Sequence, residues 1–171
     1  MNLINGQFYF YRNIIMNNIK IRVIDCHIAM YDRKFSGNLC FLLLKRSKNK
    51  IYPGIWQGVT GKIKKEEKPY KAAIRELKEE TGLIPNKAWT IDKVNMFYDA
   101  EKNIMNIIPV FGVTVNSQNI ILSEEHIDYK WCNINDAIKL LTWEQQKKGL
   151  KIFYEMLTEN KERLKIMEIN V

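Results

Sequence analysis

One acidic segment constrains this chain more than any other part of it. The stretch IRELKEETGL, residues 74–83, places Glu76, Glu79 and Glu80 close together, although the whole chain carries a formal net charge of +8. Like charges three or four residues apart on a helix repel each other by about 0.2–0.5 kcal/mol per pair. We therefore expect these carboxylates to have a role that offsets their repulsion.

The flanking residues predict that this segment is helical. Pro69 suits a first helical turn, because its missing N–H would have no partner there, and Gly82 suits the position just after a helix end. At about 100° per residue, the three glutamates share an arc of about 100°. Ala72 falls in the same arc and is expected to leave space in front of the carboxylates. The adjacent stripe, which can pack on a sheet, consists of Tyr70, Ala73 and Leu77.

The residues alone leave two interpretations of this acidic arc open, a solvated surface and a metal site. Arg75 lies four residues before Glu79, so it can pair with that side chain and hold it in place. Mg²⁺ needs oxygen ligands in near-octahedral geometry and usually keeps some of its waters. Several carboxylates with a single arginine nearby suit such an ion better than they suit a purely structural role.

The wider spacing around the acids resembles that of a known family. Starting from Gly61, the chain continues with Glu67 and then with Arg75, Glu76, Leu77, Glu79, Glu80, Gly82 and Leu83. This pattern resembles the Nudix box with every fixed position filled. The resemblance implies an α+β fold, an α/β/α sandwich around a mixed sheet, with the box as a loop-helix-loop. It also implies hydrolysis of a nucleoside diphosphate linked to another group, with Mg²⁺ or Mn²⁺ as cofactor.

Two further stretches resemble one branch of that superfamily. WQGVTG at 56–61 and EHIDYKW at 125–131 look like the bacterial enzymes that act on dATP and dihydroneopterin triphosphate, and the likeness covers roughly residues 20–155. It implies cleavage of a nucleoside or pterin triphosphate into a monophosphate and pyrophosphate. Alternatives are ADP-ribose, a dinucleoside polyphosphate or an RNA 5′ end as substrate, or a module that senses a nucleotide without cleaving it. Loss of a box carboxylate would mark such a module, and none is lost.

The resemblance also implies roles for individual residues. The metal ligands it implies are Glu76, Glu79, Glu80, the carbonyl oxygen of Gly61 and a late glutamate, Glu125, with Glu124 as its rival. Arg75 would orient the acids and Glu67 would brace the loop. The general base stays open among Glu76, Glu79 and Glu125.

Four other residues are candidates for binding the substrate. Arg46 and Lys62 can meet the phosphates, although ordinary surface charge explains them equally well. Trp56 and Tyr129 can stack on a base, with core packing as the alternative. His126 is expected to be a hydrogen-bonded structural residue rather than a ligand.

The rest of the chain mixes strands and helices without regular alternation, which favours an α+β or mixed-sheet sandwich. Strands are predicted at 19–32, 39–46, 89–100, 106–116 and 129–134, with a short strand or sharp loop at 55–63. A turn is expected at 35–38 and a loop at 47–54. Helices are expected at 135–141, after an Asn135 cap, and from Thr142, which with Gln145 has the spacing of a capping box. Residues 19–171 are expected to form a single domain, with 1–18 as an extension or extra edge strand.

Composition narrows the setting and the partners. The apolar run LCFLLL at 39–44 is too short to cross a bilayer, and the N-terminus lacks the order of a signal peptide. Three widely spaced cysteines fit burial in a reducing cytoplasm better than disulfides or zinc. The lysines are dispersed, which favours a solvated surface, so neither nucleic acid nor a membrane is expected as a partner. The small nucleotide or pterin polyphosphate substrate is what the resemblance implies. The sequence leaves the oligomeric state open.

Overall fold

The computed structural model describes residues 19–32 and 38–171. The N-terminal segment 1–18 and nearly all of the predicted turn at 35–38 lie outside the described residues. The strands are β1 Ile19–Lys20, β2 Val23–Asp32, β3 Asn38–Arg46, β4 Trp56–Gln57, β5 Val59–Lys62, β6 Lys87–Asp99, β7 Ile104–Thr114, β8 His126–Cys132 and β9 Glu168–Ile169. The helices are α2 Pro69–Thr81, α3 Ile134–Leu140, α4 Glu144–Thr158 and α5 Lys161–Ile166.

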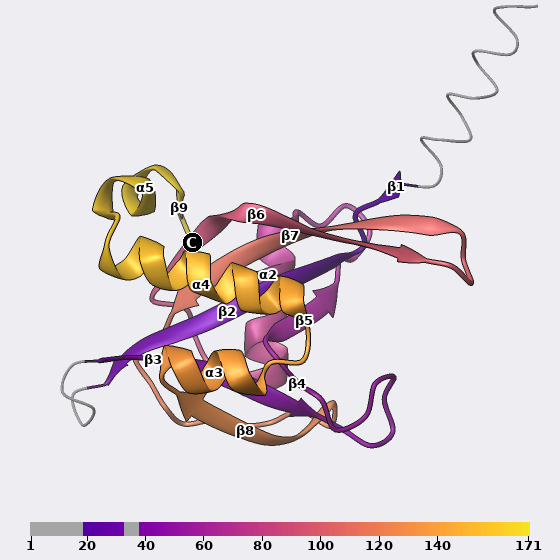
Figure 1. Cartoon of the computed structure of the whole chain (residues 1–171), viewed down its shortest axis with the longest axis horizontal. Coiled ribbons are helices and arrows are strands. Elements are labelled where there is room, and N and C mark those ends of the chain that lie inside the picture. Colours follow the sequence, from indigo (N-terminus) through magenta and orange to yellow (C-terminus); the bar gives the residue numbers. More distant parts are fainter. Residues whose placement is uncertain (1–18, 33–37) are drawn as a thin grey trace, which may run out of the picture.

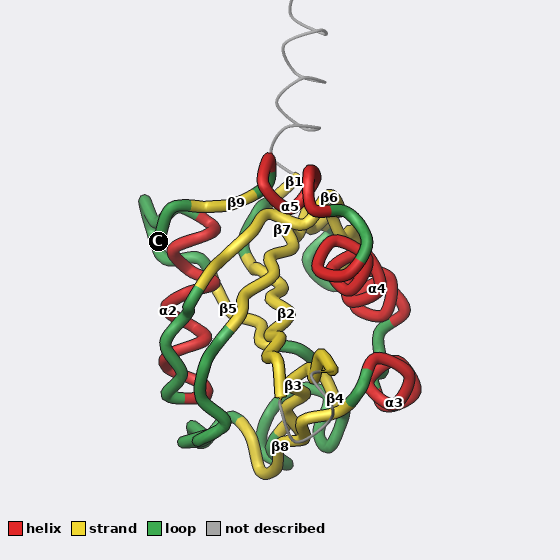
Figure 2. The backbone as a smooth tube through the Cα atoms, turned by 90° about the vertical axis from the view of Figure 1, so that its left-hand side faces the viewer, coloured by secondary structure: helices red, strands yellow, loops and turns green. Residues whose placement is uncertain are grey.

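The strands form one mixed sheet between helices (Figure 1). Its main order is β4-β3-β2-β7-β6-β9, with β1 joining β7, β5 joining β2 and β8 joining β3. The pairs β1–β7 and β2–β7 are parallel, and the other pairs are antiparallel. Figure 2 shows α2 on one face of the sheet and α3 and α4 on the other. The predicted α/β/α sandwich is therefore confirmed.

Each face of the sheet has its own apolar core, because successive side chains of a strand point to opposite faces. Ile24, Cys26 and Ile28 of β2 pack with Ala73 and Leu77 of α2. The opposite core joins residues of β2 and β3 to α3 and α4, and it includes Ala29, Phe41, Leu43, Ala137, Leu150 and Phe153. All three cysteines are buried, as predicted.

One expectation about α2 is wrong. Ala72 is fully buried in the core between α2 and the sheet, so it leaves no space in front of the carboxylates. The reason is that Ala72 and Ala73 are both small enough to lie against the sheet, which brings this part of the helix close to it. The ends of α2 agree with the prediction, since Pro69 lies in its first turn and Gly82 adopts a φ of 70° just after its end.

The predicted caps of the two later helices are wrong in position. Asn133, and not Asn135, caps α3, because its side-chain oxygen accepts a hydrogen bond from the backbone N–H of Asp136. α4 begins after Trp143 without a side-chain cap. The backbone N–H of Thr142 donates instead to the carbonyl of Trp56. No helix within the described part of the chain is long and apolar enough to cross a membrane.

Three of the predicted strand segments differ from the structure by more than a small shift of their ends. The strand predicted at 19–32 is interrupted at residues 21–22 between β1 and β2. Residues 55–63 form two short strands on either side of Gly58, where the chain passes from pairing with β3 to pairing with β2. β8 begins at His126 rather than at 129, because His126 already pairs with Arg46 of β3.

Candidate active site

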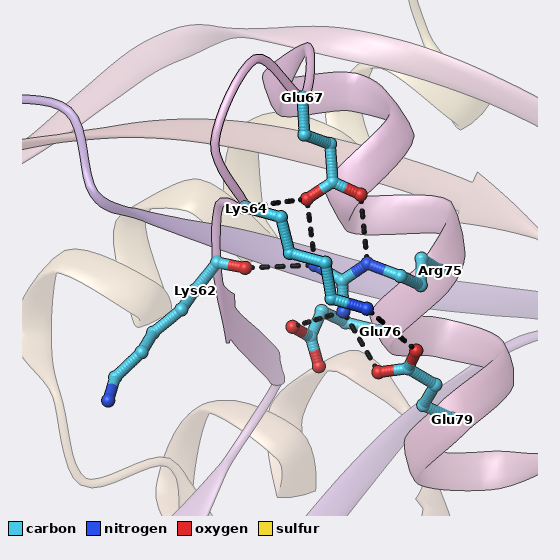
Figure 3. A network of polar contacts seen from close by, with 6 residues as sticks. All are labelled: Lys62, Lys64, Glu67, Arg75, Glu76 and Glu79. Carbon is cyan, nitrogen blue, oxygen red and sulfur yellow. Dashed lines mark hydrogen bonds and ion pairs between the residues drawn. The ribbon is translucent and has the colours of Figure 1, made fainter.

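Arg75 is the centre of a network that holds the acidic residues of α2 and the preceding loop. Figure 3 shows its guanidinium between Glu67, Glu76 and Glu79. Its Nε and Nη2 donate to the two carboxylate oxygens of Glu67 at 2.8 and 2.9 Å, and Nη1 donates to Glu76 at 2.7 Å and to Glu79 at 2.9 Å. Nη2 also donates to the carbonyl of Lys62 at 2.9 Å. The hydrogen bonds to Glu67 raise the pKa of Arg75 further above its ordinary range.

Glu67 fastens the loop before α2 to the helix. Besides Arg75, it accepts a hydrogen bond from the backbone N–H of Lys64 at 2.8 Å. The bond from Arg75 is the main reason that the pKa of Glu67 is lowered to about 2, so this carboxylate is charged at neutral pH. The bracing role expected for Glu67 therefore has a direct geometric basis.

Gly61 and Glu76 approach each other so closely that a side chain at position 61 would not fit. β5 pairs Gly61 with Ile24 of β2, and this strand lies against α2. A Cβ atom on Gly61 would lie 2.0 Å from Cδ of Glu76 and 2.3 Å from its Oε1. Burial raises the pKa of Glu76, although Arg75 opposes that effect. The backbone of β5 and the Glu76 carboxylate thus face each other directly.

Glu80 is the most deeply buried acid of the site. It is 3% exposed, and its Oε2 has no hydrogen-bond partner among the described residues. Burial raises the pKa of Glu80 well above its usual value, and the charges of Glu76 and Glu125 raise it further. Arg46 and a hydrogen bond from the backbone N–H of Thr60 act in the opposite direction. The result is a buried carboxylate whose charge the protein only partly compensates.

His126 is buried beside the acids but, within the described part of the chain, lacks the hydrogen bonds expected for it. Neither of its ring nitrogens has a hydrogen-bond partner among the described residues, and Nε2 lies 3.9 Å from Oε2 of Glu80. The ring is 5% exposed, although it lies at the very start of β8. Burial lowers the pKa of His126 to about 4, so the ring is neutral at neutral pH. The hydrogen bonds expected for His126 are therefore not found among the described residues, while its burial agrees with a structural residue.

Glu125 and Arg46 lie where the end of β3 meets the start of β8, since Arg46 pairs with His126. Glu125 forms an ion pair with Lys50 at 2.9 Å, and this hydrogen bond lowers the pKa of Glu125. Arg46 donates through Nε to the carbonyl of Ile51 at 2.7 Å, and its charge lowers the pKa values of Glu80 and Glu125. The rival residue Glu124 is exposed. Sequence reasoning missed Lys50, because nothing in its loop links it to a residue so distant in the chain.

The two aromatic candidates are not brought together. Trp56 pairs with Lys45 and Tyr129 pairs with Leu44, and neighbouring residues of a strand point to opposite faces. Trp56 packs against the core on the α4 face, with the ammonium groups of Lys45 and Lys130 each 5.7 Å from its ring centroid. Tyr129 is 39% exposed, and Lys62 is also exposed. A single base therefore does not meet Trp56 and Tyr129 on one face of the sheet.

The available donors fit a hard divalent cation. Within residues 19–32 and 38–171, no three His, Cys, Asp or Glu side chains already form a metal cage. Glu76 and Glu79 instead engage Arg75, while Glu80 keeps an unpartnered buried oxygen. Carboxylate oxygens and the nearby backbone of Gly61 are the donor types that Mg²⁺ and Mn²⁺ prefer. The positive charge of a bound Mg²⁺ or Mn²⁺ would also stabilise the buried Glu80 carboxylate, whose charge the protein only partly compensates.

Replacing Arg75 by lysine is expected to weaken this arrangement. A lysine ammonium cannot reproduce the fork that bonds Glu67, Glu76 and Glu79 together. Residues that orient metal ligands typically affect metal affinity or activity by about 10–100-fold. We expect a loss of kcat/KM in that range together with a lower Tm, measured by steady-state kinetics and calorimetry. The exposed Lys71→Arg on the same helix is the control, and an Arg75→Lys protein with unchanged kcat/KM would refute the orienting role.

The chain is similar to a known family over a region that includes all of these site residues. The sequence model described as the NUDIX domain matches residues 22–152. A bis(5′-nucleosyl)-tetraphosphatase (asymmetrical) from Caenorhabditis elegans is 30% identical over 127 residues, which cover 73% of this chain and 90% of that protein. The dihydroneopterin triphosphate diphosphatase of Haemophilus influenzae is 28% identical over 127 residues, covering 64% of this chain and 75% of that protein.

Solved structures show the same likeness. The crystal structure of a C. elegans Ap4A hydrolase binary complex superposes with a TM-score of 0.67 at 25% sequence identity. The alignment covers 81% of this chain and 98% of that one.

Proposed function

The chain belongs to the NUDIX domain family and is a hydrolase of the pyrophosphatase type, and we propose that its substrate is a nucleoside or pterin triphosphate. Hydrolysis would occur between the α and β phosphorus atoms and would release a monophosphate and pyrophosphate. The observation that carries the metal-dependent hydrolysis is the buried, partly compensated carboxylate of Glu80 beside Glu76 and the backbone of Gly61. Such a group is suited to holding a cation that the phosphates of the substrate also need.

Each residue of the site has a defined place in this proposal. Glu76, Glu80 and the carbonyl oxygen of Gly61 would hold the metal, with Glu79 and Glu125 as further ligands. A bound Mg²⁺ or Mn²⁺ would supply neutralisation of phosphate charge and a more acidic water. Arg75 holds Glu76 and Glu79 in position. The general base remains one of Glu76, Glu79 and Glu125.

Positive side chains provide the phosphate contacts. Arg46 lies close enough to Glu80 and Glu125 to lower their pKa values, so its charge reaches the region where phosphates would lie. Lys62 is exposed next to Gly61 in β5. Tyr129, which lies on the α2 face with Leu44, is the better placed of the two aromatic candidates for contact with a base. Trp56 is the less favoured one because it packs on the other face.

The substrate class rests on two lines of support. WQGVTG and EHIDYKW resemble the branch that acts on triphosphates, and a dihydroneopterin triphosphate diphosphatase is among the relatives. A dinucleoside tetraphosphate is the second candidate, because the C. elegans tetraphosphatase is 30% identical and is covered over 90% of its length. Both substrates place an anhydride next to a nucleoside-like group, so the same site can serve either.

Product analysis distinguishes these candidates. The purified chain would be incubated with dATP, dihydroneopterin triphosphate, diadenosine tetraphosphate and ADP-ribose, each with Mg²⁺, with Mn²⁺ and with excess EDTA. We expect a triphosphate to give a monophosphate and pyrophosphate, resolved from orthophosphate by ion chromatography, and we expect EDTA to abolish turnover reversibly. Inert triphosphates with rapid cleavage of diadenosine tetraphosphate would replace the first candidate by the second. Full turnover in EDTA would refute the metal-dependent mechanism.

A further inference from the structure

A buried polar cluster lies on the α4 face of the sheet, opposite the acidic residues. Asp25 of β2 is 3% exposed, and both of its carboxylate oxygens accept hydrogen bonds from side-chain amides. Nδ2 of Asn95 in β6 donates to Oδ2 at 2.9 Å, and Nε2 of Gln146 in α4 donates to Oδ1 at 2.9 Å. None of the site roles described above uses this cluster, although three elements of the fold meet there.

Gln146 also contacts the segment that leads into the active site. Its side chain is 5% exposed, and its Oε1 accepts a hydrogen bond from the backbone N–H of Gly58 at 3.4 Å. Gly58 packs tightly against β2, since a Cβ atom there would lie 3.0 Å from the carbonyl oxygen of Cys26. One amide side chain of α4 therefore bonds to both β2 and the backbone between β4 and β5.

That backbone segment supplies two parts of the site. After Gly58, β5 pairs Thr60 with Asp25 and Gly61 with Ile24. The backbone N–H of Thr60 bonds to Glu80, and Gly61 faces Glu76. Because α4 and α2 lie on opposite faces of the sheet (Figure 2), the contact from Gln146 reaches the acidic residues through the backbone of residues 58–61.

The polar cluster of Asp25, Asn95 and Gln146 fixes the position of the neighbouring backbone more strictly than apolar packing would. Buried polar groups are costly unless they are hydrogen-bonded, and hydrogen bonds constrain both distance and direction. Both oxygens of Asp25 and both polar atoms of Gln146 make such bonds, whereas Oδ1 of Asn95 has no partner among the described residues. Apolar side chains of similar volume could fill the same space while tolerating small displacements of the strand. A metal site, in contrast, requires its ligands to be held closely to the correct geometry.

We propose that Gln146 and Asp25 are positioning residues that hold residues 58–61 in register, so that Gly61 and Thr60 face Glu76 and Glu80 correctly for metal binding. The inference rests on the proposed metal-dependent function. Neither side chain touches the acids, so each acts through the backbone of β5. Positions that orient metal ligands typically change metal affinity by about 10–100-fold when they are mutated.

The test compares two adjacent glutamines of α4. Gln146→Met removes both hydrogen bonds while keeping a side chain of similar length. Gln145→Met is the matched control, because Gln145 is exposed and its Oε1 accepts a hydrogen bond from Lys93 at the surface. The Kd for Mn²⁺ would be measured by electron paramagnetic resonance below the unfolding transition, and kcat and KM would be measured at saturating metal. We expect an increase in Kd of about 10-fold for Gln146→Met and none for Gln145→Met.

A polarity swap separates positioning from a general loss of packing. Asp25→Asn alone places two amide groups against each other. In the double variant Asp25→Asn/Gln146→Glu, the amide at position 25 donates to the carboxylate at position 146, which still accepts from Gly58. We expect the swap to restore the Mn²⁺ affinity to near the wild-type value.

The results of these experiments distinguish a positioning role of Gln146 and Asp25 from a purely structural one. A folded Gln146→Met protein whose Tm falls while its Kd for Mn²⁺ stays unchanged would overturn the inference and leave a structural role. A folded Asp25→Asn/Gln146→Glu protein that binds Mn²⁺ as weakly as Gln146→Met would overturn the inference as well. Wild-type protein that does not bind Mn²⁺ would overturn the proposed function itself, and with it this inference.

Discussion

Glu80→Gln is expected to lower kcat/KM by about 10²–10³ without lowering the Tm of the metal-free protein. The substitution keeps the shape of the side chain and deletes its charge. Loss of one well-placed electrostatic contribution to the transition state typically has an effect of this size. The same change should abolish the increase in Tm that Mn²⁺ gives to the wild-type protein, because a ligand stabilises only a state that binds it.

The expected stability follows from the surroundings of Glu80. Its Oε2 is buried without a hydrogen-bond partner among the described residues, and its pKa is raised mainly by burial. A neutral amide at this position avoids the cost of a buried charge, while it can still accept the hydrogen bond from Thr60. A carboxylate retained for structure alone would show the opposite result, a clear loss of Tm.

Kinetics at saturating Mg²⁺ and thermal unfolding with and without Mn²⁺ measure the two effects. Glu155→Gln, on the exposed side of α4, is the matched control and should leave both quantities unchanged. A Glu80→Gln protein with a near-normal kcat/KM would exclude Glu80 as a metal ligand.

The helix that carries the acids could be predicted from sequence because its signals are local. Pro69 and Gly82 define both of its ends within a short stretch, and α2 runs from Pro69 to Thr81 as predicted. The cap of α4 could not be predicted in the same way. Thr142 and Gln145 have the spacing of a capping box, but contacts distant in sequence take precedence, since Thr142 bonds to Trp56 and Gln145 bonds to Lys93. Local patterns therefore fail where tertiary contacts use the same groups.

The same difference between local signals and contacts distant in sequence applies to the candidate site. Arg75, Glu76, Glu79 and Glu80 fall on consecutive turns of one helix, so their grouping can be read from spacing. The pair Lys50–Glu125 joins residues 75 positions apart, and Asp25–Gln146 joins residues 121 positions apart. Contacts at such separations depend on strand order and sheet faces. No pattern in a single sequence specifies them.

Gly61→Ala is expected to lower kcat/KM by about 10²-fold while the protein still folds. The added methyl group would lie 2.0 Å from Cδ of Glu76, so one of the two must move. The nearest atoms belong to the end of the Glu76 side chain, which is easier to displace than the paired backbone of β5. Gly61 is not among the residues with positive φ, so alanine introduces no backbone strain there. A displacement of about 1 Å in a catalytic group can lower the rate by about 10²-fold.

A double-mutant cycle tests whether this effect acts through Glu76. The variants are Gly61→Ala, Glu76→Ala and the combination of both, each measured for kcat/KM and for the Kd of Mn²⁺. If the methyl group acts by displacing Glu76, the double variant should be no worse than Glu76→Ala alone, because the side chain that it displaces is already absent. Additive losses would instead show that the methyl group disturbs the carbonyl of Gly61 or the pairing of β5 with β2. The need for glycine at position 61 would then not come from its close approach to Glu76.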